Sequence, residues 1–215
     1  MKKKEVFAEG ICLKKAFWVF LIGCIFGVLM ETIVCYFQFG VIESRKGLIY
    51  GPLNPVYGFG ATIFFIFLVK YKNPIKVFFG GMFLGGGFEY MCSLLQEKIF
   101  GTTSWNYHNQ PFNIQGRTSL FLMICWGLIA LLFVFIIYPA TSKYIEKIPI
   151  KIGNFLTIVL GIFVIWDCAI SALACYRQSE RAIGIKAENN VETYLDKHYP
   201  DKKLTEIYPH AKRRK

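Results

Sequence analysis

Three acidic side chains, those of Glu31, Glu89 and Asp167, stand within stretches of sequence that are otherwise apolar. A carboxylate inside a membrane-spanning segment is energetically costly, and such residues commonly line a pathway for ions, protons or substrates. A buried carboxylate can also act as a general base or as the counter-charge of a cation. The structural alternative is that each acid is protonated, or hydrogen-bonded to a neighbouring helix, and only holds helices together.

The three acids lie at similar depths in their segments. Each follows 14 or 15 residues after the start of its segment. At ~1.5 Å per residue this is roughly 22 Å of helix, so the acids are expected in one layer of a hydrocarbon core ~30 Å thick. Trp126, on a segment that runs the other way, reaches about the same depth. The sequence therefore predicts that these four residues line one polar cavity.

The connector after the first acid is rich in glycine, proline and aromatic residues. It reads RKGLIYGPLNPVYGFG from residue 45 to residue 60 and contains Arg45, Tyr50, Asn54 and Tyr57. Prolines fix φ and remove backbone donors, whereas glycines allow left-handed or closely packed backbone. Irregular backbone at membrane depth is tolerated only where protein or a water-filled cavity covers it. We expect this connector to be partly re-entrant and to line a pocket.

A second polar connector, GTTSWNYHNQPFNIQGR at residues 101–117, faces the same side of the membrane, because two crossings separate it from the first. Trp105 and Tyr107 offer aromatic faces, Asn113 offers hydrogen bonds, and Arg117 enters the next segment as a fixed cation. Arg117 has three interpretations: it snorkels to the interface, neutralises one of the two glutamates, or holds an anionic substrate group.

The candidate substrate-binding set combines the acids with residues of both connectors. Its members are Glu31, Arg45, Tyr50, Asn54, Tyr57, Glu89, Trp105, Tyr107, Asn113, Arg117, Trp126 and Asp167. No metal site is expected, because His108 has no second histidine near it and the seven cysteines are scattered without a Cys-x-x-Cys pair. We expect no cofactor, and the pattern identifies no catalytic residue.

The elements that must position these residues are transmembrane helices. The chain of 215 residues is 54% hydrophobic, and its apolar residues fall in blocks, which is typical of an integral membrane protein. Five apolar segments are predicted, at residues 16–39, 52–69, 75–95, 120–138 and 152–176. The second is the shortest, and it either spans the membrane or is re-entrant. The predicted fold class is an all-α bundle of about five transmembrane helices, in the lipid bilayer of the plasma membrane, with multiple passes.

Residues 1–176 are predicted to form the bundle, and residues 177–215 a basic soluble tail with one short helix that stops at Pro200. Lysines gather at the N-terminus, including Lys2, Lys3 and Lys4, which favours a cytoplasmic N-terminus. The tail carries ten basic side chains, yet five crossings would leave it outside the cell. A sixth crossing or a re-entrant second segment would place it inside.

The distribution of charge also excludes some classes of function. The formal net charge is +11, but the basic residues flank the apolar segments and fill the tail, so nucleic-acid binding is not expected. The terminal cluster at residues 212–215 either contacts anionic headgroups or is solvated. No Gly-x-x-x-x-Gly-Lys-Ser/Thr sequence occurs, so the chain cannot bind ATP through a phosphate loop.

Segments one and three resemble each other. Both contain Gly-x-x-x-Glu, at Gly27 with Glu31 and at Gly85 with Glu89, and both have a glutamine seven residues later. Transporters are often built from internal repeats, so a duplicated helix–loop–helix is one interpretation. Chance is the alternative, because the matching positions are few.

Two longer motifs carry a family resemblance. Tyr50-Gly51-Pro52-x-x-Pro55-Val56-Tyr57-Gly58-Phe59-Gly60 is one, and Trp105-x-Tyr107 with Pro111-Phe112-Asn113-Ile114-x-Gly116-Arg117 and then Trp126-Gly127 is the other. Together with Glu31 and Glu89 they resemble the boxes of a family of putative ABC-transporter permeases, type IV. The resemblance extends over nearly the whole chain. Asn106 and His108 stand where that family usually has Asp and Ser.

The resemblance implies a permease subunit that lacks its own nucleotide-binding domain and works with a separate ATPase subunit or as a homo-oligomer. A second hypothesis is an integral-membrane enzyme acting on lipid or lipid-linked substrates, with a glutamate as general base and Arg117 holding a phosphate. A third is a substrate-binding accessory component with the first connector as a lid. The sequence does not identify the substrate.

Overall fold

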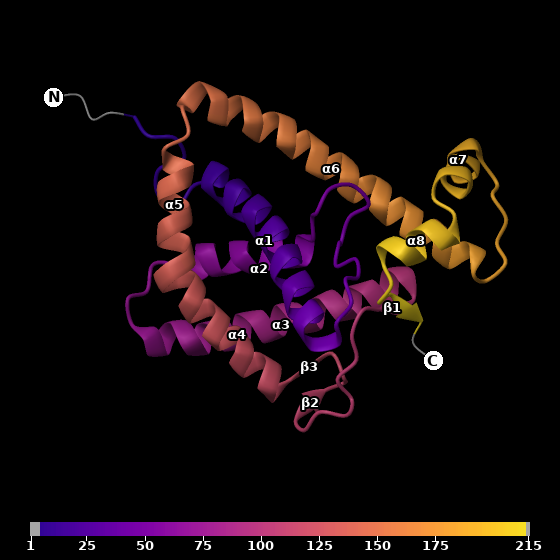
Figure 1. Cartoon of the computed structure of the whole chain (residues 1–215), viewed down its shortest axis with the longest axis horizontal. Helices are drawn as coiled ribbons and strands as arrows, with labels where there is room; N and C mark the ends of the chain where they lie inside the picture. The colour runs from indigo at the N-terminus through magenta and orange to yellow at the C-terminus, as the bar shows by residue number, and fades with distance from the viewer. Residues whose placement is uncertain (1–4, 214–215) are drawn as a thin grey trace.

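The structure is a computed structural model of the chain that describes residues 5–213 (Figure 1). Lys2, Lys3 and Lys4, which entered the prediction of orientation, lie outside the described residues, as do the last two residues of the terminal basic cluster. The helices are α1 (Leu13–Phe39), α2 (Pro55–Phe67), α3 (Pro74–Phe100), α4 (Leu120–Leu132), the π-helical η1 (Phe133–Ile137), α5 (Tyr138–Glu146), α6 (Ile150–Arg181), α7 (Asn190–His198) and α8 (Asp201–Ile207). The strands are β1 (Thr102–Thr103), β2 (Asn113–Ile114), β3 (Thr118–Ser119) and β4 (Lys212–Arg213).

Four helices are long and apolar enough to cross a membrane. They are Leu13–Phe39, Pro74–Phe100, Ile150–Arg181 and the continuous rod Leu120–Glu146, which α4, η1 and α5 form together. The prediction of an all-α membrane bundle is confirmed. The second predicted segment is shorter than expected, because α2 has 13 residues, or about 20 Å of helix at ~1.5 Å per residue.

Loop 1, residues 40–54, explains why α2 is short. The Asn54 backbone N–H donates to the Cys24 carbonyl oxygen at 3.4 Å, so the chain has returned to the middle of α1 before α2 begins. The Asn54 side chain then caps α2 by accepting from the Val56 N–H, and Pro55 occupies the first turn, where no backbone donor is needed. Leu48 and Leu53 are buried against α1 and α6. Loop 1 therefore re-enters the bundle through Leu48, Ile49 and Leu53, which are buried, while its residues 40–43 are exposed.

The pairs α1–α2 and α3–α4, which we call hairpin 1 and hairpin 2 with their connecting loops, pack in the same way. A methyl group added at Gly27 would lie 2.2 Å from the ring of Tyr57, and one at Gly85 would lie 2.5 Å from the ring of Trp126. In each hairpin the glycine one turn before the glutamate thus makes room for an aromatic ring of the partner helix.

The equivalence extends along both helix pairs. An added methyl at Gly58 would lie 2.8 Å from the Phe20 carbonyl oxygen, and one at Gly127 would lie 2.9 Å from that of Phe78. Both first helices read Phe-x-x-Gly-x-x-x-Gly-x-x-x-Glu, and both second helices read aromatic-Gly-x-x-Ala. The repeated unit is longer than the Gly-x-x-x-Glu found in the sequence alone, because its other members matter only through contacts across the hairpin.

The tail differs from the prediction. It contains two short helices rather than one, because Pro200 ends α7 and serves as the N-cap of α8. It also folds back onto the bundle: Leu195, Tyr199 and Leu204 are buried with Ile49 of loop 1 and Ala174 of α6. Figure 1 shows α7 and α8 at the C-terminal end of α6, and β4 pairs with β1 there.

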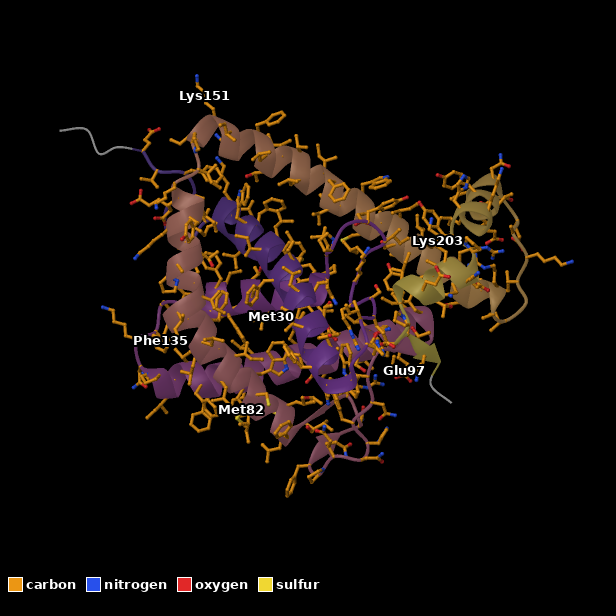
Figure 2. The ribbon with its side chains drawn as sticks, viewed as in Figure 1. Met30, Met82, Glu97, Phe135, Lys151 and Lys203 are labelled. Atoms are coloured by element: carbon orange, nitrogen blue, oxygen red, sulfur yellow. The ribbon has the colours of Figure 1, made fainter. Side chains whose placement is uncertain are left out.

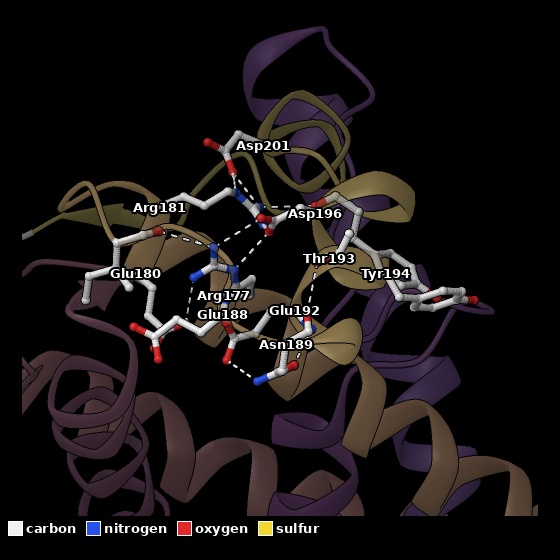
Figure 3. Close-up of polar contacts among 12 residues, drawn as sticks. Arg177, Glu180, Arg181, Glu188, Asn189, Glu192, Thr193, Tyr194, Asp196 and Asp201 are labelled. Carbon is white, nitrogen blue, oxygen red and sulfur yellow. Dashed lines mark hydrogen bonds and ion pairs between the residues drawn. The ribbon is translucent and has the colours of Figure 1, made fainter.

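The docked tail lies on the same side as the two polar loops. Within the described residues no further long apolar helix follows α6, so the sixth crossing considered from the sequence is absent from this part of the chain. α6 itself is longer than predicted and extends to Arg181. Arg177 and Arg181 both bind Asp196 of α7, and this cluster fixes the tail to the end of α6 (Figure 3).

Candidate functional site

Glu31 of α1 is held by residues of α2 and loop 1. The Tyr57 hydroxyl donates a short hydrogen bond to one carboxylate oxygen, and the Arg45 guanidinium lies 3.4 Å from the other. Loop 1 places Arg45 there because it re-enters the bundle, and Asn54 supports it by donating to the Arg45 carbonyl oxygen at 3.1 Å. Glu31 therefore has a cation from its own hairpin.

Glu89 of α3 has a different set of partners. Its carboxylate accepts hydrogen bonds from the Thr118 hydroxyl at 2.8 Å, the Tyr107 hydroxyl at 3.3 Å and the Trp126 indole N–H at 3.4 Å. All three donors are neutral and come from hairpin 2. The side chain is buried, and no lysine, arginine or histidine of the described residues forms an ion pair with it.

Tyr107 donates a hydrogen bond to Glu89 and lies within electrostatic range of Glu31. Burial raises the pKa of its phenol, and the charges of Glu89 and then of Glu31 raise that pKa further. A single phenol is thus close enough to both carboxylates to respond to each. Because its pKa is raised, Tyr107 is a neutral donor at physiological pH. The structure brings Glu31, Tyr57, Tyr107, Glu89 and Trp126 together where the two hairpins meet.

Arg117 binds neither of the two intramembrane glutamates. Its guanidinium pairs with Glu97 at 2.6 Å and donates to the Ser93 hydroxyl at 3.2 Å, both on α3 (Figure 2 labels Glu97). The Trp105 indole N–H holds the Arg117 carbonyl oxygen at 2.9 Å. Glu97 was not singled out from the sequence. The available signal was its spacing from Ser93 and Glu89, which places all three on one face of a helix.

Asp167 of α6 lies in a separate cluster. One carboxylate oxygen accepts from the Tyr50 backbone N–H and from the Ser171 hydroxyl, each at 3.2 Å, and the other has no hydrogen-bond partner. No hydrogen bond or ion pair of the described residues joins Asp167 to Glu31 or Glu89.

Loop 1 and the tail cover Asp167. The Tyr50 hydroxyl lies 2.9 Å from that of Tyr199 in the tail, and the Tyr50 ring packs on Trp166 with ring centroids 5.1 Å apart. Ser171 was not singled out from the sequence, and nothing in the sequence indicates that the tail folds back to bring Tyr199 to this place. A cavity shared by all three acids stays a prediction.

Asn113 stabilises loop 3, residues 101–119. Its side chain donates to the carbonyl oxygens of His108 at 3.1 Å and Gln110 at 2.8 Å, and accepts from the Gly116 N–H at 2.9 Å. Together with Asn54 and Trp105, it shapes the loops that present the tyrosines and arginines. Within residues 5–213 no group of three or more His, Cys, Asp or Glu side chains is placed to hold a metal ion.

Comparison with known proteins gives one match. A family model described as "Putative ABC-transporter type IV" matches residues 18–172, which include both hairpins and all three acids. No curated protein and no solved structure matches the chain.

Proposed function

The chain belongs to the putative ABC-transporter type IV family, and from this membership we propose that it is a permease-like subunit of a plasma-membrane transporter. The chain has no phosphate loop, so the energy for transport would come from a separate ATPase subunit, or the chain would act as a homo-oligomer. The observation that carries the proposal is the cluster of Glu31, Tyr57, Tyr107 and Glu89 between the two hairpins.

The proposed route for the solute runs between the hairpins. Sites at the interface of internal repeats near the membrane midplane are typical of transporters, because two similar halves can rock about a fixed site. Here the repeated glycine–aromatic contacts would keep each hairpin rigid, and the tyrosines between the acids would form the polar surface that the solute meets. The substrate remains unassigned.

Cysteine accessibility tests this route. In a variant whose seven native cysteines are replaced, single cysteines at Glu31, Glu89 and Tyr107 should react with a water-soluble, membrane-impermeant maleimide in sealed vesicles of each orientation. Phe83, 62% exposed on the outer face of α3, gives the matched control and should react only with a lipid-soluble maleimide. If the glutamate positions behave as Phe83 does, the route is rejected.

Association with an ATPase tests the partner. The tagged chain, purified from the cells that naturally make it, should retain a phosphate-loop ATPase whose rate of ATP hydrolysis changes in Glu89→Gln. Phe83→Leu is the control and should leave that rate unchanged. Chemical change of a bound lipid by the wild type, but not by Glu89→Gln, would instead support the enzyme hypothesis and contradict the permease.

A further inference from the structure

The buried cations of the described chain are all paired with acids. Lys15, fully buried at the start of α1, lies 2.5 Å from Glu146 of α5. Arg117 lies 2.6 Å from Glu97. Arg177, 1% exposed, contacts Asp196 and Glu180 at 3.0 Å each (Figure 3). The fold thus supplies a counter-charge to every cation that it buries within residues 5–213.

The buried acids of the same residues do not follow this rule. Glu89 is 8% exposed and Asp167 is fully buried, and neither forms an ion pair. Glu89 has three neutral donors. Asp167 has two neutral donors on one oxygen, while its second oxygen is buried without a hydrogen-bond partner. Glu31 in hairpin 1 contrasts with both, because Arg45 lies beside it.

The titratable groups around the two acids do not supply the missing charge. Glu89 faces Cys92 on its own helix and Tyr107 of loop 3, with Glu31 beyond Tyr107. Asp167 faces Cys168 on its own helix, Lys46 of loop 1, and Tyr199 and Tyr208 of the tail. Lys46 is exposed and makes no ion pair with Asp167. Burial raises the pKa of both tail tyrosines, so both are neutral phenols.

An ionised carboxylate without a counter-charge is strongly unfavourable in a low-dielectric interior. Removing the partner of a buried ion pair is among the costliest changes in a protein for this reason. A positive charge from solution would remove the imbalance. One carboxylate with neutral neighbours balances the charge of one monovalent ion, whereas a divalent ion at the same place would leave one positive charge buried and unbalanced. The unpartnered oxygen of Asp167 offers the free acceptor that such an ion needs.

We propose that Glu89 and Asp167 each take a monovalent cation from solution, either a proton or an alkali-metal ion, and exchange it during the working cycle. The exchange of cations during a working cycle rests on the proposed transport function. The binding of a cation to the two acids does not depend on that function and can be measured without any transport. Glu31 would take no part in this exchange, because Arg45 balances its charge within the chain.

A hydrophobic carbodiimide provides the first test, because it reacts with protonated carboxyl groups inside membranes and needs no variant. In wild-type protein at pH 7 in choline chloride, peptide mass spectrometry should find the adduct on Glu89 and Asp167 and not on Glu31. Replacement of choline by sodium at constant ionic strength distinguishes the two cations: sodium would protect both acids from labelling if it is the ligand, and would have no effect if the proton is.

Infrared spectroscopy of the isosteric variants provides the second test. In choline buffer, the carbonyl band of protonated carboxyl groups should have about half its wild-type intensity in Glu89→Gln and about half in Asp167→Asn, each measured as a single variant. It should keep its wild-type intensity in Glu31→Gln. The proposal is overturned if Glu89 and Asp167 escape the carbodiimide in sodium-free buffer and both variants keep the full band. If the carbodiimide and infrared results are as expected but cysteines at Glu31 and Glu89 do not react with the water-soluble maleimide, the transport route is rejected and the cation sites are still supported.

Discussion

Hairpin 1 and hairpin 2 share their packing and differ in how their acid is balanced. In both, a glycine one turn before the glutamate receives an aromatic ring from the second helix, and that ring donates a hydrogen bond to the glutamate. In hairpin 1 the acid also has Arg45 at 3.4 Å. In hairpin 2 the arginine of the connector, Arg117, binds Glu97 instead. Equal packing therefore does not imply equal electrostatics.

The difference lies in the connectors. Loop 1 is stabilised by hydrogen bonds to α6 and to the tail. The Ile49 N–H donates to the Ser171 hydroxyl of α6 at 2.9 Å, and the Ser44 hydroxyl donates to the Ile207 carbonyl oxygen at 2.7 Å. In the described part of the chain, loop 3 contacts the tail only at its start, where β1 pairs with β4, and its residues 106–119 are stabilised by contacts within the loop, through the β2–β3 pair and the hydrogen bonds of Asn113. The close packing of the helices tolerates few substitutions, whereas the loops tolerate many. The partner of each glutamate can therefore differ between the loops while the helix packing stays the same.

The largest expected effects test whether the two packing seams are equivalent. Gly27→Ala would place a methyl 2.2 Å from a ring carbon of Tyr57, and the equivalent Gly85→Ala would place one 2.5 Å from a ring carbon of Trp126. Each should lower the free energy of unfolding by about 3 kcal/mol, because overpacking of a closed interface forces the helices apart. The measurement is unfolding in mixed micelles.

Gly87→Ala is the matched control, because no atom lies within 4 Å of the added methyl. It should leave stability unchanged or raise it slightly, since alanine favours helices over glycine. A loss of stability in Gly27→Ala alone, with Gly85→Ala tolerated, would show that only hairpin 1 is packed as described.

A smaller effect is expected from the acids themselves. Glu31→Gln should lower the free energy of unfolding by about 1.5 kcal/mol, because Arg45, whose side chain is 12% exposed, would keep only the more exposed Glu43 as a charged partner. Glu89→Gln should lower the free energy of unfolding by less, because no cation loses its partner and the three donors still have an oxygen that accepts their hydrogen bonds. Equal losses in the two variants, measured by thermal unfolding at pH 7, would remove the electrostatic contrast between the hairpins.

Much of this architecture could be predicted from the sequence, because apolar runs of sufficient length and glycine–proline connectors act locally. The helical class and the partial re-entry of the first connector follow from such patterns. The partner of Arg117 and the docking of the tail could not be predicted, because they depend on which surfaces meet in three dimensions. The spacing of Glu97 places it on the helix face of Glu89 and Ser93 but does not identify Arg117 as its partner, and no local pattern indicates that Tyr199 docks against loop 1.

The reliance of loop 1 on the tail can be tested by pH. Arg177 and then Arg181, through hydrogen bonds to Asp196, lower the pKa of that carboxyl below its ordinary value of 3.8. Such a group stabilises the docked tail at pH values above 3.8, and the contribution is lost as the pH falls below 3.8 through the lowered pKa. The effect should be about 1 kcal/mol or less, because the Asp196 side chain is 30% exposed and solvent screens its ion pairs.

Hydrogen exchange reads this effect separately in each loop. Residues 40–54 should exchange faster as the tail loosens below pH 4, relative to unstructured peptide at the same pH, and residues 106–119 should not. In Asp196→Asn, loop 1 should already exchange faster at pH 7 and show no further step in acid. Equal acceleration of both loops would mean that the tail supports them alike.

The smallest expected effects test whether the sites around Glu31 and Glu89 are energetically coupled. Tyr57→Phe removes the hydroxyl that Glu31 accepts, and Tyr107→Phe removes one of three donors to Glu89, while both keep their rings. Each should cost about 0.6 kcal/mol, the average for hydrogen bonds between membrane helices. Because Tyr107 responds to the charges of both glutamates, the double variant should differ from the sum of the single ones by about 0.5 kcal/mol. Additive losses in mixed-micelle unfolding would show that each hairpin holds its own independent acid, and the contrast between Glu31 and Glu89 would then be a property of two separate sites.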